Sequence, residues 1–534
     1  MNDDVDEMGK ARARVEALQR HLAKTATGAT ECVETHSSWV VLSGEWVWKI
    51  KKPLDLGFLD YSTLALRRRY CEEEVRLNRR TAPELYVGVV ALTRCADGVQ
   101  PDGVGEALDY AVQMHRFPAS ALLATRLENG ELEASHLDAV ARHIADFHAA
   151  AASVETSAPW GRFAAVHEPV QQNFAQLREC LHENADVSAK DDLARLTRLE
   201  RWSERTGQAL APVFAARRAA GRVRECHGDL HLANVVWLQD GPRLFDGIDF
   251  NPALRWTDVA ADVAFLVMDL QARGRDDLAW GFLNAWVEWS GDHDALRVMR
   301  YYVVYRALVR AKVAAIRMEQ TQGRERAAAR DECGRYIQLA ERASAPVAPV
   351  LFIAHGVSGS GKSVCAARLL AERAVIRVRA DVERRRVVGL ALDVRSSANP
   401  ELQLYTPAMH ARTYARLSAV GEAVIRAGWP VLLDATFLRR DGRDAMRALA
   451  KRCGVPCVIM ACEAPVAVLR DRVARRLAQA ADPSEADVNV LEGQLRTRQQ
   501  LAADERAQAV IVDTSREIDW PAWLEAIDAR CGWG

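Results

Sequence analysis

Hydrophobic residues recur along this chain with two different periods, and each change of period predicts where helices give way to strands. Apolar side chains follow the spacing of one helix face over residues 5–24. Two apolar runs, residues 39–42 and 46–50, then flank a short turn that contains Gly44. This pattern is typical of a β-hairpin. The chain therefore opens with an amphipathic helix followed by paired strands.

The pattern after this hairpin is mostly helical. Residues 62–79 return to helical spacing, and residues 107–117 are expected to form another strand. Helical patterning dominates residues 135–220 and again residues 255–342. Between these two stretches, Asp240-Gly241-Pro242 separates two short apolar runs and predicts a second hairpin.

The pattern changes again near the two prolines of residues 343–349, which discourage both a helix and a central strand and so predict a linker. The apolar run that follows, residues 350–354, is typical of a buried strand. Further short apolar runs at residues 430–433 and 456–460 alternate with helical segments. That alternation indicates an α/β domain built on a parallel sheet.

The composition is that of an ordinary water-soluble protein. The chain has 534 residues, 49% hydrophobic and 27% charged, with a net charge of −1. This length predicts more than one domain, and the charge balance gives no indication of nucleic acid binding. No apolar run reaches the roughly 20 residues that span a bilayer. The N-terminus lacks a secretory signal, and eleven cysteines without a CxxC pair are typical of reduced thiols, so we expect a cytoplasmic protein without a membrane partner.

A first phosphate-handling motif lies at residues 227–234, HGDLHLAN. In a phosphoryl-transfer site of the protein-kinase type, an aspartate receives the acceptor proton and an asparagine binds Mg²⁺. We expect Asp229 and Asn234 to take these roles. Asp249 is preferred as the second metal ligand, because Asp246, which lies in a DFG-like Phe-Asp-Gly, is more directly tied to the turn; Asp246 stays open as the alternative.

Such a site also needs a lysine on the phosphates and a glutamate that holds it. Lys49 and Lys51 share one face of the expected strand, since side chains alternate. Lys49 is preferred because of its x-Val-x-Lys context, with Lys51 as the alternative. Its expected partner is Glu74 on the following helix, with Glu73 as the alternative.

A second phosphate motif, GVSGSGKS at residues 356–363, is a complete Walker A loop between a predicted strand and a predicted helix. Its glycines let backbone N–H groups surround a polyphosphate at a helix N-terminus. Lys362 would neutralise phosphate oxygens, and Ser363 would ligate Mg²⁺. Asp434, at the end of a predicted strand, is the expected Walker B-like carboxylate; a buried strand-end aspartate is the alternative. The residues expected to hold the nucleotide are Gly356, Ser358, Gly359, Ser360, Gly361, Lys362 and Ser363.

The remainder of this segment resembles the P-loop kinases that include gluconate kinases, zeta-toxin-like kinases and polynucleotide 5′-kinases. The resemblance is carried by the Walker A loop, by Asp381 and Arg384 in the Asp-x-x-Arg arrangement, and by the arginines of residues 469–476. It implies that Asp381 accepts the hydroxyl proton and Arg384 holds the substrate. It also implies that Arg472 and Arg476, four residues apart, act from a lid helix on the transferring phosphoryl group.

The acceptor of this second site is expected to be anionic, because arginines concentrate around the Asp-x-x-Arg segment. A nucleotide, a nucleic-acid end or a sugar phosphate would suit such a pocket. Aromatic residues for stacking bases are not interleaved there, so nucleic acid is possible as a partner but not implied.

The first segment resembles the aminoglycoside phosphotransferase branch of the protein-kinase-like fold. HGDLHLAN, residues 248–251 (IDFN) and residues 258–264 (DVAADVA) carry the resemblance, which implies ATP and Mg²⁺ as cofactors and a hydroxyl of a small molecule as acceptor. It also implies that Asp262 is a buried structural acid.

The whole chain resembles a bacterial fusion of such a domain with a P-loop kinase-like ATPase. We therefore expect an α+β protein-kinase-like fold over residues 1–342 and an α/β P-loop NTPase fold with a parallel sheet over residues 350–534. The leading hypothesis is a bifunctional phosphotransferase with ATP at two sites. The alternative is that one half is a regulatory nucleotide-binding module and only the other half is catalytic.

Overall fold

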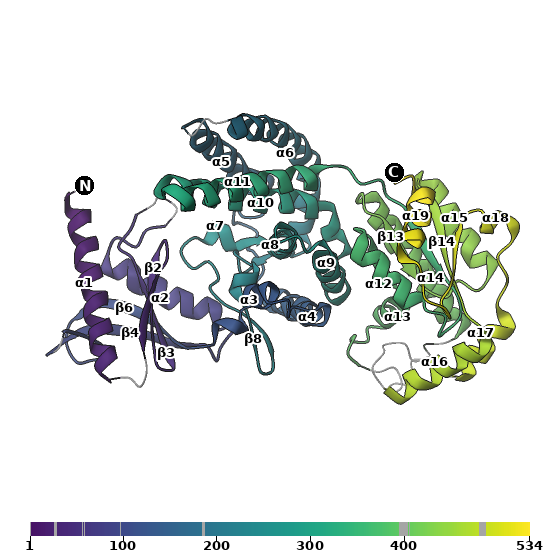
Figure 1. Ribbon diagram of the computed structural model, residues 1–534, viewed down its shortest axis with the longest axis horizontal. Helices are drawn as coiled ribbons and strands as arrows, with labels where there is room; N and C mark the ends of the chain where they lie inside the picture. The colour runs from purple at the N-terminus through teal and green to yellow at the C-terminus, as the bar shows by residue number, and fades with distance from the viewer. Residues whose placement is uncertain are drawn as a thin grey trace. The chain divides into compact units, whose positions relative to one another are not determined.

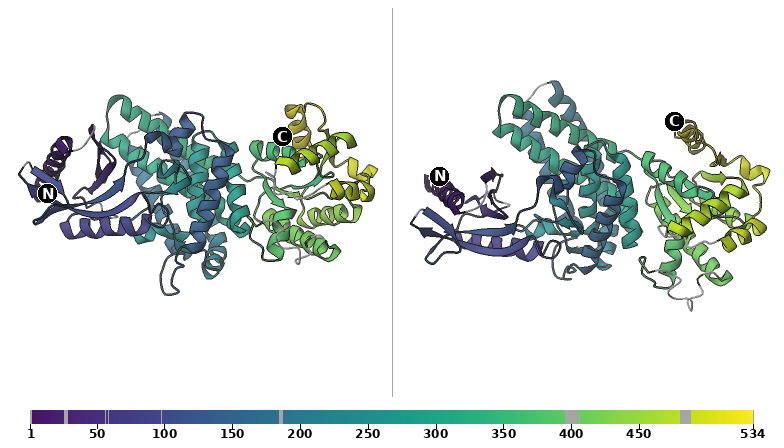
Figure 2. Two further views of the ribbon diagram at one scale, coloured as in Figure 1. Left: turned by 90° about the horizontal axis from the view of Figure 1, so that it is seen from below. Right: turned by 60° about the horizontal axis from the view of Figure 1, so that its bottom comes forward.

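The computed structural model describes residues 2–25, 29–55, 57, 59–96, 98–183, 187–394, 404, 406–479 and 488–533. The chain divides into two compact units. The first contains residues 1–183 and 204–269, and the second contains residues 184–203 and 270–534. The ribbon views show the elements of each unit (Figures 1 and 2).

The first unit begins with an antiparallel sheet whose strand order is β1-β2-β3-β6-β4-β5. The strands are β1 (Thr30–Glu34), β2 (Ser38–Ser43), β3 (Trp46–Lys51), β4 (Tyr86–Cys95), β5 (Gly98–Pro101) and β6 (Ala107–His115). The hairpin predicted around Gly44 is therefore present as β2 and β3.

Both faces of this sheet are covered by a helix, as the alternation of side chains along a strand allows. Helix α1 (Asn2–Thr25) packs on one face, where its Leu18 joins Trp39 of β2 in a buried cluster. Helix α2 (Leu64–Asn78) packs on the other face, where its Val75 joins Val47 of β3. Figure 1 shows the strands between these two helices. The α1 and α2 helices correspond to those expected from the apolar periodicity.

The rest of the first unit is mainly helical and contains the HGDLHLAN segment. Its elements are η1 (Ala119–Ala121), α3 (Leu123–Glu128), α4 (Ala134–Ala150), α5 (Phe163–Glu183), the second part of α6 (Val187–Ala219), β7 (Val223–Glu225), η2 (Leu232–Asn234), β8 (Val235–Leu238), β9 (Gly241–Leu244), α7 (Pro252–Arg255), β10 (Trp256–Asp258) and most of α8 (Val259–Ala272). The predicted second hairpin is β8 and β9. The short antiparallel pair of β7 and β10 interrupts a stretch expected to be helical, because Trp256 to Asp258 pair with residues more than thirty positions earlier in the chain.

The second unit combines helices with a parallel sheet of order β12-β13-β11-β14-β15. The strands are β11 (Leu351–His355), β12 (Ile376–Arg379), β13 (Val431–Asp434), β14 (Cys457–Glu463) and β15 (Ala509–Asp513). The sheet confirms the α/β fold expected from the alternation of apolar runs and helices.

Helices flank this sheet and precede it in the chain. Those that precede it are α9 (Asp276–Ser290), η3 (His293–Ala295), α10 (Leu296–Gln320) and α11 (Gly323–Ser344). Those interleaved with the strands or following them are α12 (Lys362–Glu372), α13 (Ala380–Val387), α14 (Pro407–Arg426), α15 (Arg440–Cys453), α16 (Val466–Gln479), α17 (Val488–Thr497), α18 (Ala503–Arg506) and α19 (Trp520–Cys531). Helix α12 and helix α19 pack on the sheet through a buried cluster that includes Leu369, Phe352 and Ile527.

The chain segment between α11 and β11 lacks regular structure, as the two prolines there predict. Helices α9 to α11 belong to the same compact unit as the parallel sheet, although they precede this segment. The domain limits inferred from the sequence, 1–342 and 350–534, remain predictions. None of the helices in the described ranges has the length and apolarity needed to cross a bilayer.

Candidate active sites

Strand β3 of the first unit directs two lysines toward one glutamate. Lys49 Nζ lies 2.9 Å from Glu74 Oε1, and Lys51 Nζ lies 2.8 Å from Glu74 Oε2. Strand alternation puts both lysines on one face of β3, and Glu74 faces them from helix α2. The structure thus brings together the preferred pair, Lys49 and Glu74, and the alternative lysine as well. Glu73 instead pairs with Arg76 and Arg255.

The two lysines differ in their second carboxylate partner. Lys49 pairs with Asp246, whose side chain is 46% exposed. Lys51 Nζ lies 2.5 Å from Asp249 Oδ2, and these side chains are only 1% and 8% exposed. Tyr61 Oη, 3.3 Å from both Lys51 Nζ and Asp249 Oδ2, closes this second pair. The Lys49–Asp246 pair therefore opens to solvent, whereas the Lys51–Asp249 pair is internal.

The lysines keep Glu74 ionised. Burial alone would raise the pKa of Glu74, but Lys49 and Lys51 outweigh it and lower the pKa to about 2. Burial alone would lower the pKa of Lys49, but the Asp246 and Glu74 carboxylates outweigh it and raise that pKa well above its ordinary value. At neutral pH the site thus presents a charged lysine held from two sides.

The HGDLHLAN segment places Asp229 and Asn234 in contact. Asn234 Nδ2 donates to the main-chain oxygen of Asp229 at 2.9 Å and to its Oδ2 at 3.2 Å. His231 Nε2 lies 3.3 Å from the same Oδ2. The side chain of Asp229 is 37% exposed, so a carboxylate oxygen is open to an incoming hydroxyl.

Two buried carboxylates of helix α8 hold this segment. Asp262 accepts from the main-chain N–H of His227 and of Gly228, both at 2.8 Å. Asp269 Oδ2 accepts from the main-chain N–H of Leu232 at 2.9 Å. Gly228 has a φ of +87°, and a Cβ there would lie 3.0 Å from the main-chain oxygen of Leu254, so the turn needs glycine. Asp262 thus has the contacts of a structural acid.

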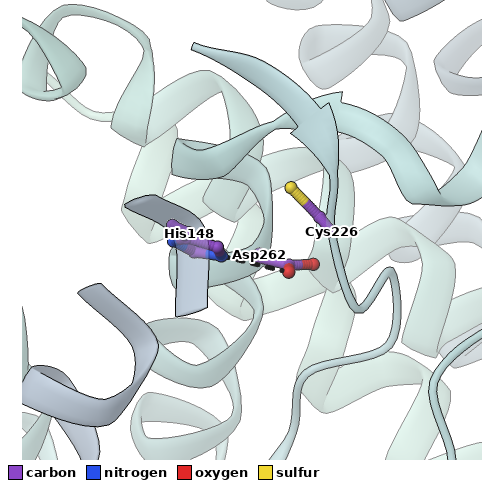
Figure 3. A group of neighbouring side chains, drawn as sticks. All are labelled: His148, Cys226 and Asp262. Atoms are coloured by element: carbon purple, nitrogen blue, oxygen red, sulfur yellow. Dashed lines mark hydrogen bonds and ion pairs between the residues drawn. The ribbon is translucent and has the colours of Figure 1, made fainter. Parts of the chain in front are cut away.

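Behind this turn lies a buried group of three side chains, His148, Cys226 and Asp262 (Figure 3). Their potential ligand atoms lie within 4.8 Å of one another. His148 Nε2 is 3.3 Å from Asp262 Oδ2, and Cys226 Sγ donates to the main-chain oxygen of Thr257 at 3.4 Å. Because Asp262 also accepts two backbone N–H groups, we assign the group to holding the turn and not to a metal.

His227 connects the Asp229 loop to the loop that carries Asp246. Its Nδ1 accepts from the Asp229 N–H at 3.3 Å, so Nε2 carries the proton and donates to the Phe245 main-chain oxygen at 2.9 Å. Burial lowers the pKa of His227, which favours this neutral tautomer. Asp246 itself has a φ of +61°, and its N–H donates to Tyr86 Oη at 3.0 Å. Sequence reasoning did not identify His227, although its position beside Gly228-Asp229 was a usable signal.

In the second unit, the Walker A loop connects β11 to α12. Lys362 Nζ donates to the main-chain oxygens of Gly356 and Val357, both at 2.9 Å. A Cβ at Gly361, which has a φ of +88°, would lie 2.8 Å from Thr514 Cγ2. Ser363 is exposed in the first turn of α12. The loop is thus closed around its own lysine, at the N-terminus of a helix where phosphates bind.

The ends of β12 and β13 carry the other residues predicted for this site. Asp434 ends β13, and its Oδ2 accepts from Arg377 Nε at 2.8 Å. Asp381 lies in the first turn of α13, is 45% exposed, and its Oδ1 lies 2.6 Å from Arg384 Nη1. The predicted acceptor pair, Asp381 and Arg384, is therefore in contact, while Asp434 has an arginine partner that the sequence did not indicate.

Arg472 contacts the Walker A loop directly. Its Nη1 donates to the Gly359 main-chain oxygen at 3.2 Å and to Thr514 Oγ1 at 2.9 Å, and its Nη2 donates to the Thr514 oxygen at 2.6 Å. Thr514 Oγ1 in turn donates to the Ser360 oxygen at 3.0 Å. The sequence predicted Arg472 as a lid residue on the phosphoryl group. The side chain of Arg476, predicted with it, lies outside the described part of the chain.

A further contact to the loop comes from Gln494 of helix α17. The main-chain N–H of Ser358 donates to Gln494 Oε1 at 2.7 Å. Helix α17 is held beside the loop by Leu491, which packs with Val357 in a buried cluster. Sequence reasoning missed Gln494, because a single glutamine on a helix carries no local signal.

Two family models match this chain. The model described as "Phosphotransferase enzyme family" matches residues 63–302, and the model described as "AAA domain" matches residues 351–501. The first match contains Glu74, Asp229 and Asp246, and the second contains the Walker A loop and Asp434. Each match thus covers one of the two sites.

The chain is also similar to known proteins. It is 32% identical over 445 residues to the Mycobacterium tuberculosis protein called "Uncharacterized protein Rv2004c", covering 83% of this chain and 85% of the relative. A choline kinase structure from Cryptosporidium parvum overlaps 61% of this chain and 96% of its own, at 10% identity and a TM-score of 0.38. A gluconokinase structure from Sinorhizobium meliloti overlaps 35% of this chain and 90% of its own, at 19% identity and a TM-score of 0.23.

Proposed function

Because the chain belongs to the family that joins a phosphotransferase-enzyme domain to a P-loop AAA domain, we propose that it is a phosphotransferase with two ATP sites, each passing the γ-phosphoryl group to a hydroxyl acceptor. Phosphotransfer is common to both parts of the family. The proposal adds two separate sites, a magnesium requirement at each, and an anionic acceptor at the second. The observation that carries it is that each family match contains its own phosphate-type lysine in a built setting, Lys49 and Lys362.

At the first site, Lys49 would neutralise phosphate oxygens of ATP while Glu74 keeps it in position. Asp229 would accept the proton of the acceptor hydroxyl as the new O–P bond forms and the bond from the γ-phosphorus to the bridging oxygen breaks. The products are ADP and a phosphate ester. The 37% exposure of Asp229 and its contact with Asn234 support this role.

The donor atoms of this site suit Mg²⁺, which prefers oxygen ligands and, when bound, neutralises charge on the β- and γ-phosphate oxygens. Asn234 would contribute its Oδ1, since its Nδ2 is directed at Asp229. For the second ligand we propose Asp246 in place of Asp249, the residue preferred from the sequence. Asp246 is half-exposed beside Lys49, whereas the Asp249 carboxylate is buried against Lys51.

At the second site, Lys362 and the backbone of the Walker A loop would bind the phosphates, and Ser363 and Asp434 would hold Mg²⁺. Asp381 would accept the acceptor proton, and Arg384 would hold the acceptor. The contact of Asp381 with Arg384 at the end of β12 supports this assignment. In parallel α/β sheets, ligands bind outside the carboxyl ends of the strands, which is where both residues lie.

The test uses full-length protein with Asp229→Ala, Lys362→Ala and both changes together, incubated with γ-labelled ATP and an extract of cytosolic metabolites and RNA. We expect two sets of labelled products, one lost with Asp229→Ala and the other lost with Lys362→Ala. The exposed Asp146→Asn, where the side chain is 75% exposed, is the matched control in the first unit.

Three results would be decisive. If neither variant changes the labelled products, the proposal fails. If one variant removes all products while the other site still binds Mg·ATP without turnover, that second site is a regulatory nucleotide-binding module. If both variants remove the same product, the two sites act on one reaction.

A further inference from the structure

Helix α9 completes the free edge of the parallel sheet in the second unit. Strand β12 is the edge strand and pairs only with β13 within the sheet. On its other side, Asn284 Nδ2 donates to the Val375 main-chain oxygen at 2.9 Å, and the Arg377 N–H donates to Asn284 Oδ1 at 2.7 Å. The side-chain amide thus does what a neighbouring strand would do, because it satisfies both a donor and an acceptor of the edge.

One helical turn further along α9, Glu288 reaches the end of the same strand. Residues four apart lie on one helix face, so Glu288 follows Asn284 toward the carboxyl end of β12. Its carboxylate pairs with Arg379, the last residue of β12. Arg386, in the last turn of α13, donates to the Glu288 main-chain oxygen. Glu288 therefore sits between the two ends of the helix that carries Asp381 and Arg384.

Arg379 lies where an acceptor would bind. It is paired in register with Asp434 and lies two residues before Asp381. Burial would lower the pKa of Arg379, but the carboxylates of Glu288, Asp434 and Asp381 outweigh it and raise the pKa. Glu288 accepts from Nη2, while the buried Nε of Arg379 has no hydrogen-bond partner among the described residues. The guanidinium is thus oriented by one carboxylate and keeps donors that this carboxylate does not use.

We propose that Glu288 is a positioning residue for the acceptor: it orients Arg379 to hold an anionic group, a phosphate or a carboxylate, beside Asp381. The inference rests on the proposed phosphotransfer at the P-loop site and names the chemical class that this site recognises. Guanidinium groups bind such anions through parallel N–H donors, and a carboxylate partner fixes the plane of the fork. Since α9 lies within residues 63–302, the acceptor site of the P-loop module includes a helix from the phosphotransferase-family segment.

The first test measures binding of inorganic phosphate to the full-length protein saturated with Mg²⁺ and a non-hydrolysable ATP analogue, so that the phosphate positions of both nucleotide sites are filled. Arg379→Gln is expected to raise the Kd for phosphate about tenfold, through loss of a charge-assisted hydrogen bond. Glu288→Ala should approach that value. Glu288→Gln keeps an oxygen that can accept from Arg379 and should fall between wild type and Glu288→Ala.

Two control variants separate positioning from folding. Asn284→Ala removes the other α9 contact to β12 without touching the Arg379 side chain. Glu422→Gln changes a surface glutamate of α14 that pairs with Arg426. We expect Asn284→Ala to lower the thermal midpoint with little effect on phosphate affinity, and Glu422→Gln to change neither. If phosphate affinity falls in step with thermal stability across Asn284→Ala and Glu288→Ala, Glu288 only holds the fold and the inference is overturned.

The second test follows the labelled products that depend on Lys362. Glu288→Ala should raise the KM for the acceptor fraction several-fold and leave the KM for ATP unchanged. An unchanged acceptor KM, or phosphate binding that does not respond to Arg379→Gln, contradicts the inference. Failure of the proposed function is distinguishable, because it removes Lys362-dependent products altogether and leaves the phosphate-binding series to be read by itself.

Discussion

Lys51 and Asp249 form an internal ion pair, with Nζ 2.5 Å from Oδ2, directly beside the Lys49–Glu74 pair on the same strand face. Two lysines thus share one glutamate, but only Lys49 continues to an exposed carboxylate. A charge network of this kind can assign a functional role to one lysine and a structural role to the other. The two roles make opposite predictions.

Lys49→Ala is expected to abolish transfer at the first site by at least about a hundredfold, because the phosphates lose their cation. Lys51→Ala leaves Glu74 and Asp249 buried without this partner, and removing one member of a buried pair costs about 3–5 kcal/mol. We therefore expect Lys51→Ala to lower the free energy of unfolding more than Lys49→Ala does. Urea denaturation and γ-labelled ATP transfer, measured in a Lys362→Ala background, check both. A larger loss of stability in Lys49→Ala would contradict the assignment.

The two aspartates of the following loop separate in the same way. Asp246→Asn should raise the Mg²⁺ concentration needed for half-maximal transfer about tenfold or more, because a carboxylate ligand is replaced by an amide. Asp249→Asn should leave the Mg²⁺ dependence unchanged and lower stability, since it breaks the pair with Lys51. Magnesium titrations of transfer in a Lys362→Ala background distinguish them. The opposite pattern would restore Asp249 as the ligand preferred from the sequence.

Arg472 is expected to act on the shape of the Walker A loop. Arg472→Gln and Thr514→Val each remove contacts to the Gly359 and Ser360 carbonyls. Both should weaken Mg·ATP binding at the second site about tenfold, since a misplaced loop loses backbone contacts to phosphate. Nucleotide binding by calorimetry in a Lys49→Ala background measures this. If Arg472→Gln lowers kcat and leaves the Kd for ATP unchanged, the lid role predicted from the sequence holds instead.

Local motifs were enough to predict both folds. The HGDLHLAN segment and the Walker A loop are contiguous in the chain, and the strands beside them follow from apolar runs and turn residues. Side-chain alternation also predicted that Lys49 and Lys51 share a face, which their common contact with Glu74 confirms.

The remaining choices depend on contacts between distant residues. Asp246 and Asp249 differ in burial only because Lys51 of β3 pairs with one of them. Arg472 faces the Walker A loop because Thr514, more than forty residues later, accepts from it. Glu288 and Asn284 reach β12 from a helix that the sequence places in the other domain. No pattern local to these residues could have specified such pairings.

Two buried histidines of the second unit predict its response to acid. Burial, partly offset by Glu383 and reinforced by Arg386 and Arg416, lowers the pKa of His293 from 6.5 to about 4. Burial likewise lowers the pKa of His355 to about 4. As pH falls below 6.5 the unfolded chain binds protons that the folded protein does not, so stability falls between pH 6.5 and pH 4. A difference of this size corresponds to at most about 3 kcal/mol for each histidine.

We therefore expect the urea midpoint of the second unit, followed by tryptophan fluorescence, to fall on acidification from pH 7 to pH 4.5. His293→Gln should reduce this pH dependence, and combination with His355→Gln should reduce it further, because a glutamine cannot take up the proton. His182→Gln, at an exposed position of α5, is the control. Stability may be lower in the variants at pH 7, through lost packing, without affecting the argument, since the measured quantity is the slope with pH. Parallel pH curves for wild type and the double variant would show that these histidines do not cause the acid sensitivity.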